Sequence, residues 1–188
     1  MNNILVKEQF GFREKSSTEM ATLYLLNTVL SSLDEQKIVG GLFCDLQKAF
    51  DCVNHNILLA KLEFYGVSGT TNKLLQSYLS GRYQRTVIKD NLSNKTVSEW
   101  ELVKHGVPQG SILGPLLFLI YINDLSRSIS NVPNTVLFSA DTSIIISNSN
   151  QDEFKTNINS VMNEITNWFQ SNLLTLNCNK THFLQFLT

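Results

Sequence analysis

The hydrophobic positions of this chain switch between a helical and a strand-like period, and the switches predict its elements. Capping-box spacing puts Ser16 at the start of a helix with Glu19 three residues on, and apolar residues keep a helical period to about Gln36. The run 38–46 is β-branched or apolar and ends in a lone acid. This pattern predicts a central strand with Asp45 at its carboxyl end.

Further along, the pattern predicts four more helices and five more strands. The expected helices begin at Asn54, at Asn72 and near Gln151, and a longer apolar one covers 112–128. The expected strands are 84–89, 96–103, 134–138, 142–147 and 184–187. This order predicts an α+β domain with a mainly antiparallel sheet and helices packed on one face.

Composition narrows the function classes. The 188 residues fit one domain, and the net charge of −1 lacks the basic surplus of a protein that binds nucleic acid mainly through phosphates. The three cysteines have neither disulfide nor zinc spacing. The longest apolar run, 112–122, is too short for a bilayer, and the N-terminus lacks signal-peptide features. We therefore expect an intracellular protein with no membrane partner.

Two features carry candidate chemistry. Asp45 at a strand end is either the N-cap of a turn at Gln47 or a Mg²⁺ ligand, and the second reading needs another acid nearby, which Asp141 supplies from a tight hairpin. The loop 106–115, dense in turn formers, either feeds the next helix or lets backbone approach a base or sugar.

Five segments, in this order, resemble the reverse transcriptase domain of non-LTR (LINE-type, jockey-like) retrotransposons. They are 9–18, 45–55, 106–125, 138–142 and 168–181. A single such match would be weak, but the set covers nearly the whole chain.

The resemblance implies a polymerase palm with part of the fingers and no thumb. It makes 1–188 a single partial reverse transcriptase domain, with a fingers remnant at 1–37 and the palm at 38–188. It further implies two-metal nucleotidyl transfer with Mg²⁺, an RNA template, a DNA primer and deoxynucleotide triphosphates. The resemblance also implies a longer polyprotein, encoded by a transposable element, that supplies the fingers, thumb and endonuclease regions. Such a polyprotein would take part in the DNA integration of the element.

The resemblance also implies residue roles. Asp45, Asp141 and the carbonyl of Leu46 would bind the metal ions, and Lys180 would protonate the departing pyrophosphate. The bulky side chain of Phe50 would exclude a ribose 2′-OH. Gln109 and Gly110 would contact the incoming nucleotide and the template base. Arg13 would contact the template or the triphosphate.

One position departs from the family pattern. In 138–142, where the family has Phe-Ala-Asp-Asp-Thr, Ala140 occupies the place of the first acid and Asp141 that of the second. An alanine supplies no oxygen to a metal ion, so the sequence predicts an impaired or inactive polymerase. The alternatives are a non-catalytic nucleic-acid-binding or scaffold protein that reuses the palm, and a non-functional pseudogene product.

Overall fold

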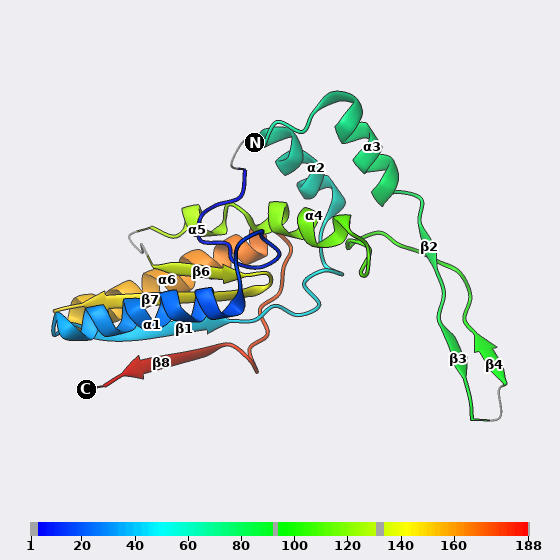
Figure 1. The fold of residues 1–188 in the computed structure, drawn as a ribbon. Helices are drawn as coiled ribbons and strands as arrows, with labels where there is room; N and C mark the ends of the chain where they lie inside the picture. The colour runs from blue at the N-terminus through cyan, green and yellow to red at the C-terminus, as the bar shows by residue number, and fades with distance from the viewer. Residues whose placement is uncertain (1–3, 92–93, 131–133, 188) are drawn as a thin grey trace.

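The computed structural model describes residues 4–91, 94–130 and 134–187. Its centre is a four-stranded sheet in the order β6-β7-β1-β8, antiparallel throughout (Figure 1). The strands are β1 (Ile38–Cys44), β6 (Thr135–Phe138), β7 (Asp141–Asn148) and β8 (His182–Phe186). The antiparallel α+β fold predicted from the sequence is therefore confirmed.

Helices cover both faces of this sheet. On one face Val39 and Ile145 pack against Val29 of α1 (Thr18–Asp34). On the other face the core that contains Leu42 also contains Phe154 of α6 (Gln151–Ser171). The expectation that helices pack on one face only is wrong, because β1 and β7 are apolar on both sides and each side needs a cover.

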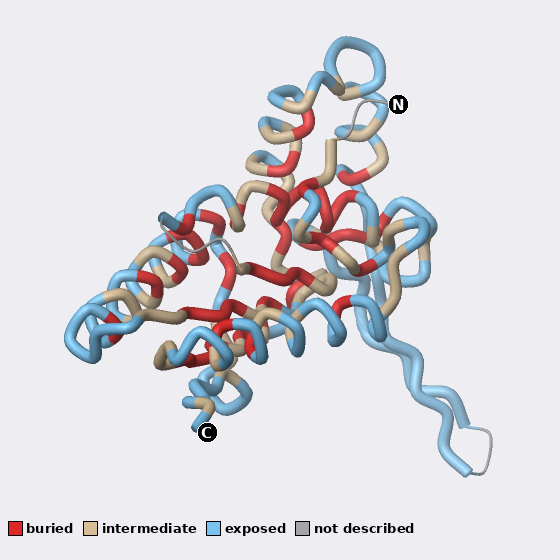
Figure 2. The backbone as a smooth tube through the Cα atoms, turned by 60° about the vertical axis from the view of Figure 1, so that its left-hand side comes forward, coloured by how far each residue is buried: buried red, intermediate tan, exposed pale blue. Residues whose placement is uncertain are grey.

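A helical layer and a projecting arm complete the molecule. The layer consists of α2 (His55–Phe64), α3 (Gly69–Leu79), α4 (Leu113–Ile122) and α5 (Leu125–Ser128). The arm is built from β2 (Tyr83–Gln84), β3 (Val87–Lys89), β4 (Lys95–Val97) and β5 (Glu101–Leu102). Buried residues concentrate in the sheet and in α4, whereas the described part of the arm is exposed (Figure 2).

Several predicted boundaries need correction. The N-cap of α1 is Ser17, whose hydroxyl accepts from the Met20 N–H, and α3 begins at Gly69. The expected helix 112–128 is divided near Asn123, whose buried amide accepts from Val6 N–H and donates to the carbonyl of Ile4. The expected strands 84–89 and 96–103 are each broken in two, and residues 92 and 93 of the predicted turn lie outside the described residues.

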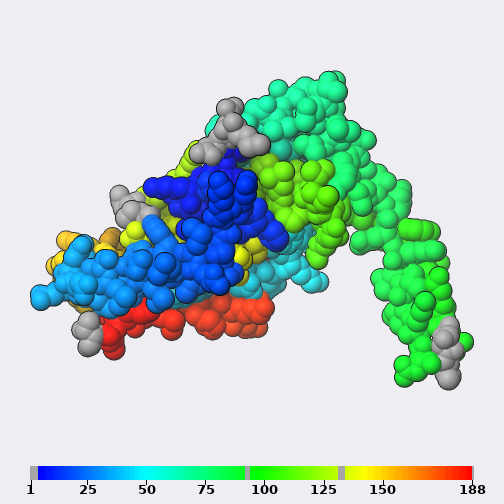
Figure 3. All heavy atoms as spheres, viewed as in Figure 1, coloured from blue at the N-terminus to red at the C-terminus, as the bar shows by residue number. Residues whose placement is uncertain are grey.

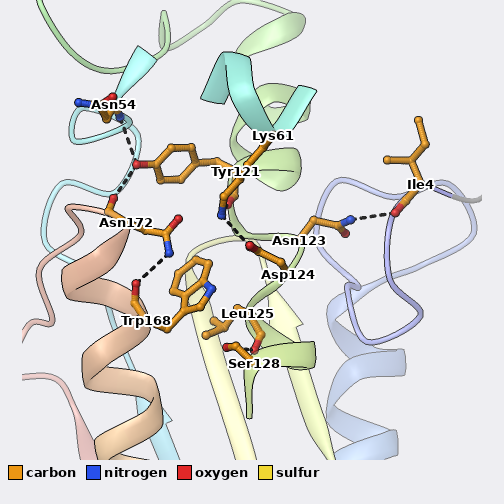
Figure 4. A network of polar contacts seen from close by, with 10 residues as sticks. All are labelled: Ile4, Asn54, Lys61, Tyr121, Asn123, Asp124, Leu125, Ser128, Trp168 and Asn172. Atoms are coloured by element: carbon orange, nitrogen blue, oxygen red, sulfur yellow. Dashed lines mark hydrogen bonds and ion pairs between the residues drawn. The ribbon is translucent and has the colours of Figure 1, made fainter. Parts of the chain in front are cut away.

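A polar network at Tyr121 joins α2, α4 and α6 (Figure 4). The Tyr121 hydroxyl donates to the carbonyl of Asn172 at 2.5 Å and accepts from the N–H of Asn54 at 3.4 Å. Lys61 donates to the Tyr121 carbonyl at 2.6 Å and to Asp124 at 2.7 Å, and its ammonium lies 4.7 Å from the ring centre of Trp168. Burial lowers the pKa of Lys61, and its pairing with Asp124 opposes that change.

No helix in the described part of the chain is both long enough and apolar enough to cross a bilayer.

Candidate active site

Two carboxylates meet where β1 ends and β7 begins. The β1–β7 ladder pairs Cys44 with Thr142, and one further step in the same register sets Asp45 opposite Asp141. Directly opposite residues project to the same side of a sheet with their Cβ atoms about 5 Å apart. The pKa of Asp141 is raised by desolvation and by the charge of Asp45, while Lys180 acts in the opposite direction.

The segment that follows α6 holds Asp45 in place. The Asn177 side-chain amide donates to Oδ2 of Asp45 at 3.0 Å, and the Lys180 ammonium lies 3.7 Å from the same oxygen. The backbones also join, since the Asn177 N–H donates to the Asp45 carbonyl at 2.9 Å. The structure therefore brings Lys180 to Asp45, and its role toward pyrophosphate stays a prediction.

The alternative role for Asp45 as a helix N-cap is wrong. The chain after it forms a turn at 47–52, where the N–H groups of Asp51 and Cys52 both donate to the Lys48 carbonyl, and no helix begins before His55. Because no helix starts at Gln47, the Asp45 carboxylate has no free helical N–H groups to cap.

The β6–β7 hairpin turns through Ser139 and Ala140, which separate the paired residues Phe138 and Asp141. Ser139 adopts a left-handed φ of 56°, and the half-buried Ala140 packs against the main core. The position where the family has its first acid therefore carries a methyl group at the tip of the hairpin.

Gln9, to which the sequence reasoning gave no site role, holds this hairpin. Its side-chain carbonyl accepts from the N–H of Ser139 at 3.1 Å and from the N–H of Gly11 at 2.8 Å. A Cβ on Gly11 would lie 2.3 Å from the Ser139 nitrogen, so only glycine allows this approach. The signal in the sequence was an amide two residues before a glycine, but nothing local indicated its distant partner.

Leu46 directly follows Asp45, and Phe50 lies in the turn after it. Leu46 forms an isolated antiparallel bridge with Leu176. The two hydrogen bonds of this bridge use the N–H of Gln47 and the carbonyl of Asp45, so they leave the carbonyl of Leu46 unused. Phe50 stacks on Phe118 with ring centres 4.5 Å apart and meets Phe12 edge-on at 6.4 Å. The half-buried ring of Phe50 is thus fixed from two sides.

The glycine-rich loop is fastened to the turn that carries Phe50. Val107 N–H donates to the Phe50 carbonyl at 2.9 Å, and Nε2 of His55 donates to the Gly106 carbonyl at 2.8 Å. The Gln109 amide donates to Asp51 at 2.8 Å. These contacts set the predicted nucleotide-facing loop beside the predicted steric gate.

The remaining predicted residues differ in their surroundings. Gly110 is exposed, has a φ of 82°, and would meet nothing within 4 Å if it carried a Cβ. Arg13 donates to the carbonyl of Val6 at 3.0 Å within the N-terminal loop. Its role toward template or triphosphate stays a prediction.

The donor set does not fit a pair of divalent ions. Two Mg²⁺ ions held for phosphoryl transfer share carboxylates, and each needs near-octahedral oxygen ligands. Here the hairpin tip contributes only the methyl group of Ala140. The candidate site therefore has two acids, Asp45 and Asp141. Among the described residues, no three His, Cys, Asp or Glu side chains come together in a way that could hold a metal ion.

Comparison with known proteins agrees with this layout. Residues 1–187 match the family model described as reverse transcriptase (RNA-dependent DNA polymerase). A probable RNA-directed DNA polymerase from transposon BS of Drosophila melanogaster is 35% identical over 128 residues, which cover 65% of this chain and 13% of that protein. The jockey polymerase of Drosophila funebris is 34% identical over 119 residues, which cover 63% of this chain and 12% of that protein.

Solved structures show the same fold at low sequence identity. Apo telomerase from Candida tropicalis, truncated from its C-terminal domain, superposes with a TM-score of 0.67 and 15% identity over 96% of this chain and 36% of its own. Telomerase from Candida albicans, in complex with a fragment of telomeric RNA, superposes with a TM-score of 0.62 and a sequence identity of 13%. The match covers 94% of this chain and 32% of the telomerase chain.

Proposed function

Because this chain belongs to the reverse transcriptase (RNA-dependent DNA polymerase) family, we propose that it is part of a retrotransposon polymerase that has lost most of its catalytic power. The chain spans about 13% of the length of the curated relatives it matches, so the activity of a whole polymerase is itself a part of this proposal. The division into a fingers remnant at 1–37 and a palm at 38–188 belongs to it as well.

The observation that carries the proposal is the hairpin tip beside Asp45. The β1–β7 register sets Asp45 opposite Asp141, while Ala140 stands where the resemblance implies the first acid of the pair. Losing even an outer partner of a metal ligand lowers affinity or activity about 10–100-fold, so losing a direct ligand has at least that effect. The fold is kept and the chemistry is impaired.

For the other site residues the proposal keeps the roles that the resemblance implies. Phe50, fixed by Phe118, would exclude a ribose 2′-OH, and Gln109 with Gly110 would face the incoming nucleotide and the template base. Lys180, beside Asp45, would give a proton to the departing pyrophosphate. The substrates would be an RNA template, a DNA primer and deoxynucleotide triphosphates, inside the cell, with Arg13 touching template or triphosphate.

Ala140 also favours a second candidate function. A palm without its metal ligand is free to act as a non-catalytic nucleic-acid-binding or scaffold protein. Such a protein binds RNA equally well with and without Mg²⁺, whereas a polymerase gains a tighter grip on its primer end when metal and nucleotide are present.

Primer extension on an RNA template tests the proposal. The chain is compared with its Ala140→Asp variant, and Ala140→Asn serves as the control that restores size without charge. We expect deoxynucleotide incorporation to rise at least about 10-fold with Ala140→Asp and to stay unchanged with Ala140→Asn. Equal incorporation by the unchanged chain and by Ala140→Asp contradicts the proposed impairment.

A further inference from the structure

Helix α1 is apolar on two opposite sides, and the sheet covers one of them. On that side Leu25 and Val29 belong to the small core between α1 and the sheet. The other side carries a row of leucines that project into solvent, with Leu23 59% exposed, Leu26 53% and Leu30 56%. A helix that is apolar on all sides is normally buried on all sides, and an extended exposed apolar patch marks a site of interaction. The outer side of α1 therefore has the character of an interface.

The leucines on this side have the spacing of a coiled-coil seam. They are Leu23, Leu26, Leu30 and Leu33, which follow one another at intervals of three, four and three residues. Such a row lies along one side of a helix and packs against the matching row of a second helix. A strand presents its side chains at every second residue and does not match this spacing. We call these four residues the leucine seam.

The leucine seam borders strand β8, and Figure 3 shows α1 (blue) and β8 (red) side by side. Phe186 of β8 joins Leu33 in the small core beneath α1. Leu184, two residues earlier on the same side of the strand, is 53% exposed. A hollow of about 370 Å³ opens between the end of α1 and β8, lined in part by Leu33, Phe186 and Leu187. The apolar surface of the seam therefore continues onto β8, with a hollow at the junction that can take a large apolar side chain.

The charges at the two ends of the leucine seam are acidic. Helix α1 contains no Lys or Arg, and its two acids, Glu19 and Asp34, are both exposed. Glu19 precedes Leu23 by four residues and Asp34 follows Leu30 by four, so both acids lie on the side of the seam. Among the described residues, neither acid has a Lys or Arg nitrogen within 4 Å. The helical rise sets the two acids about 22 Å apart, a separation that a helix with a cation at each end would match.

A second copy of this chain fits the leucine seam poorly. In an antiparallel pair of α1 helices, Glu19 of each copy would lie against Asp34 of the other. In a parallel pair, each acid would lie against its own equivalent. Like charges that face each other across a helix pair oppose that pairing, and opposite charges select the partner. The charge pattern therefore favours a different, basic helix over self-association.

We propose that the leucine seam of α1 binds an amphipathic helix of a partner protein, with apolar residues in heptad spacing and a Lys or Arg at each end. The apolar side of that helix packs on the seam, and its cations pair with Glu19 and Asp34. One large apolar side chain enters the hollow beside β8. The binding uses no metal ion, no primer and no particular residue at position 140, so it stands or falls independently of the proposed function.

Fluorescence anisotropy with two labelled synthetic helices tests this site. Each peptide has about 18 residues with leucines at the spacing of the seam. One carries lysines at the separation of Glu19 and Asp34, and the other carries glutamates in their place. We expect the lysine peptide to bind the unchanged chain at least about 5-fold more tightly than the glutamate peptide. The double variant Glu19→Gln, Asp34→Asn should lose this preference and bind the two peptides about equally.

The apolar contact is tested with a matched pair of substitutions. Leu26→Ser should weaken binding of the lysine peptide at least about 10-fold. Leu74→Ser makes the same change on a leucine of α3 that is also exposed, and should leave binding within about 2-fold of the unchanged chain. Circular dichroism confirms that each variant is folded, as expected for side chains that project into solvent.

Four results would overturn the proposal. The first three are no binding of the lysine peptide, equal binding of the two peptides by the unchanged chain, and equal binding by Leu26→Ser and Leu74→Ser. The fourth is a dimer of the unchanged chain, seen by analytical ultracentrifugation, that Leu26→Ser dissociates and Leu74→Ser does not. That result would make a second copy of this chain the occupant of the leucine seam.

Discussion

Asp45 and Asp141 face each other one step beyond the last pair of the β1–β7 ladder, so two like charges share the end of a strand pair. The charge of Asp45 contributes to the raised pKa of Asp141, and the ammonium of Lys180 opposes this effect. Lys180 and Asn177, which both lie in the segment after α6, contact Asp45. The electrostatics of the site are therefore those of a pair of acids with one exposed cation.

Removing the charge of Asp45 should lower the pKa of Asp141. In Asp45→Asn the like charge is gone and only desolvation still raises that pKa. In Lys180→Met the pKa should move further up, because the opposing cation is lost. Side-chain carboxyl chemical shifts followed by NMR through a pH titration measure both changes, and an identical Asp141 titration in all three proteins contradicts this description.

The raised pKa of Asp141 should also make the folded chain less stable as the pH rises. The folded chain binds a proton at Asp141 more readily than the unfolded chain does, so this group reduces stability as the pH rises through its raised pKa. Asp141→Asn should thus be slightly more stable than the unchanged chain at neutral pH, by no more than about 1 kcal/mol for so exposed a group. Below pH of about 3 the difference should vanish, because the carboxyl is then protonated in both states. Urea unfolding at neutral pH and below pH of about 3 measures the difference in unfolding free energy between Asp141→Asn and the unchanged chain. A difference that is larger in acid than at neutral pH contradicts the prediction.

Gln9 should contribute more to stability than Gln109, although both are hydrogen-bonded amides. Gln9→Met leaves the buried N–H of Gly11 and the half-buried N–H of Ser139 without their acceptor, at a cost of about 2–4 kcal/mol. Gln109→Met removes one exposed bond to Asp51 and should cost less than about 1 kcal/mol. Equal free energies of unfolding for the two variants would show that Gln9 does not hold the hairpin.

His55 should anchor the glycine-rich loop. His55→Ala removes the donor to the Gly106 carbonyl and should cost about 1 kcal/mol. Amide hydrogen exchange of Val107, whose N–H bonds to Phe50, should become faster in this variant. His105→Ala, on the exposed root of the arm, is the matched control and should leave Val107 protected.

The sequence was enough to place the two acids. The lone acid at the end of an apolar run predicted Asp45 at a strand end, and the turn residues before position 142 predicted Asp141 in a tight hairpin; the observed register brings the two opposite each other, with Asp141 as the first residue of β7. The N-cap at Asn54 was also predictable, because it depends on residues adjacent in the chain.

Contacts between distant segments were beyond such reasoning. Nothing near Gln9 indicates that its amide meets Ser139, and nothing in the period of α1 indicates which face of the sheet it covers. The arm strands were predicted as continuous because their residues favour strands. They are interrupted in the structure, where both sides of the ribbon are exposed and no core holds a regular ladder.

Binding of Mn²⁺, a paramagnetic substitute for Mg²⁺, tests the central claim most directly. Electron paramagnetic resonance gives the dissociation constant for the unchanged chain, for Ala140→Asp and for Ala140→Asn. The account predicts that Ala140→Asp binds Mn²⁺ at least about 10-fold more tightly than the unchanged chain, and that Ala140→Asn does not. If the unchanged chain binds two ions as tightly as Ala140→Asp does, the incomplete carboxylate set is no obstacle to metal binding and the account is wrong.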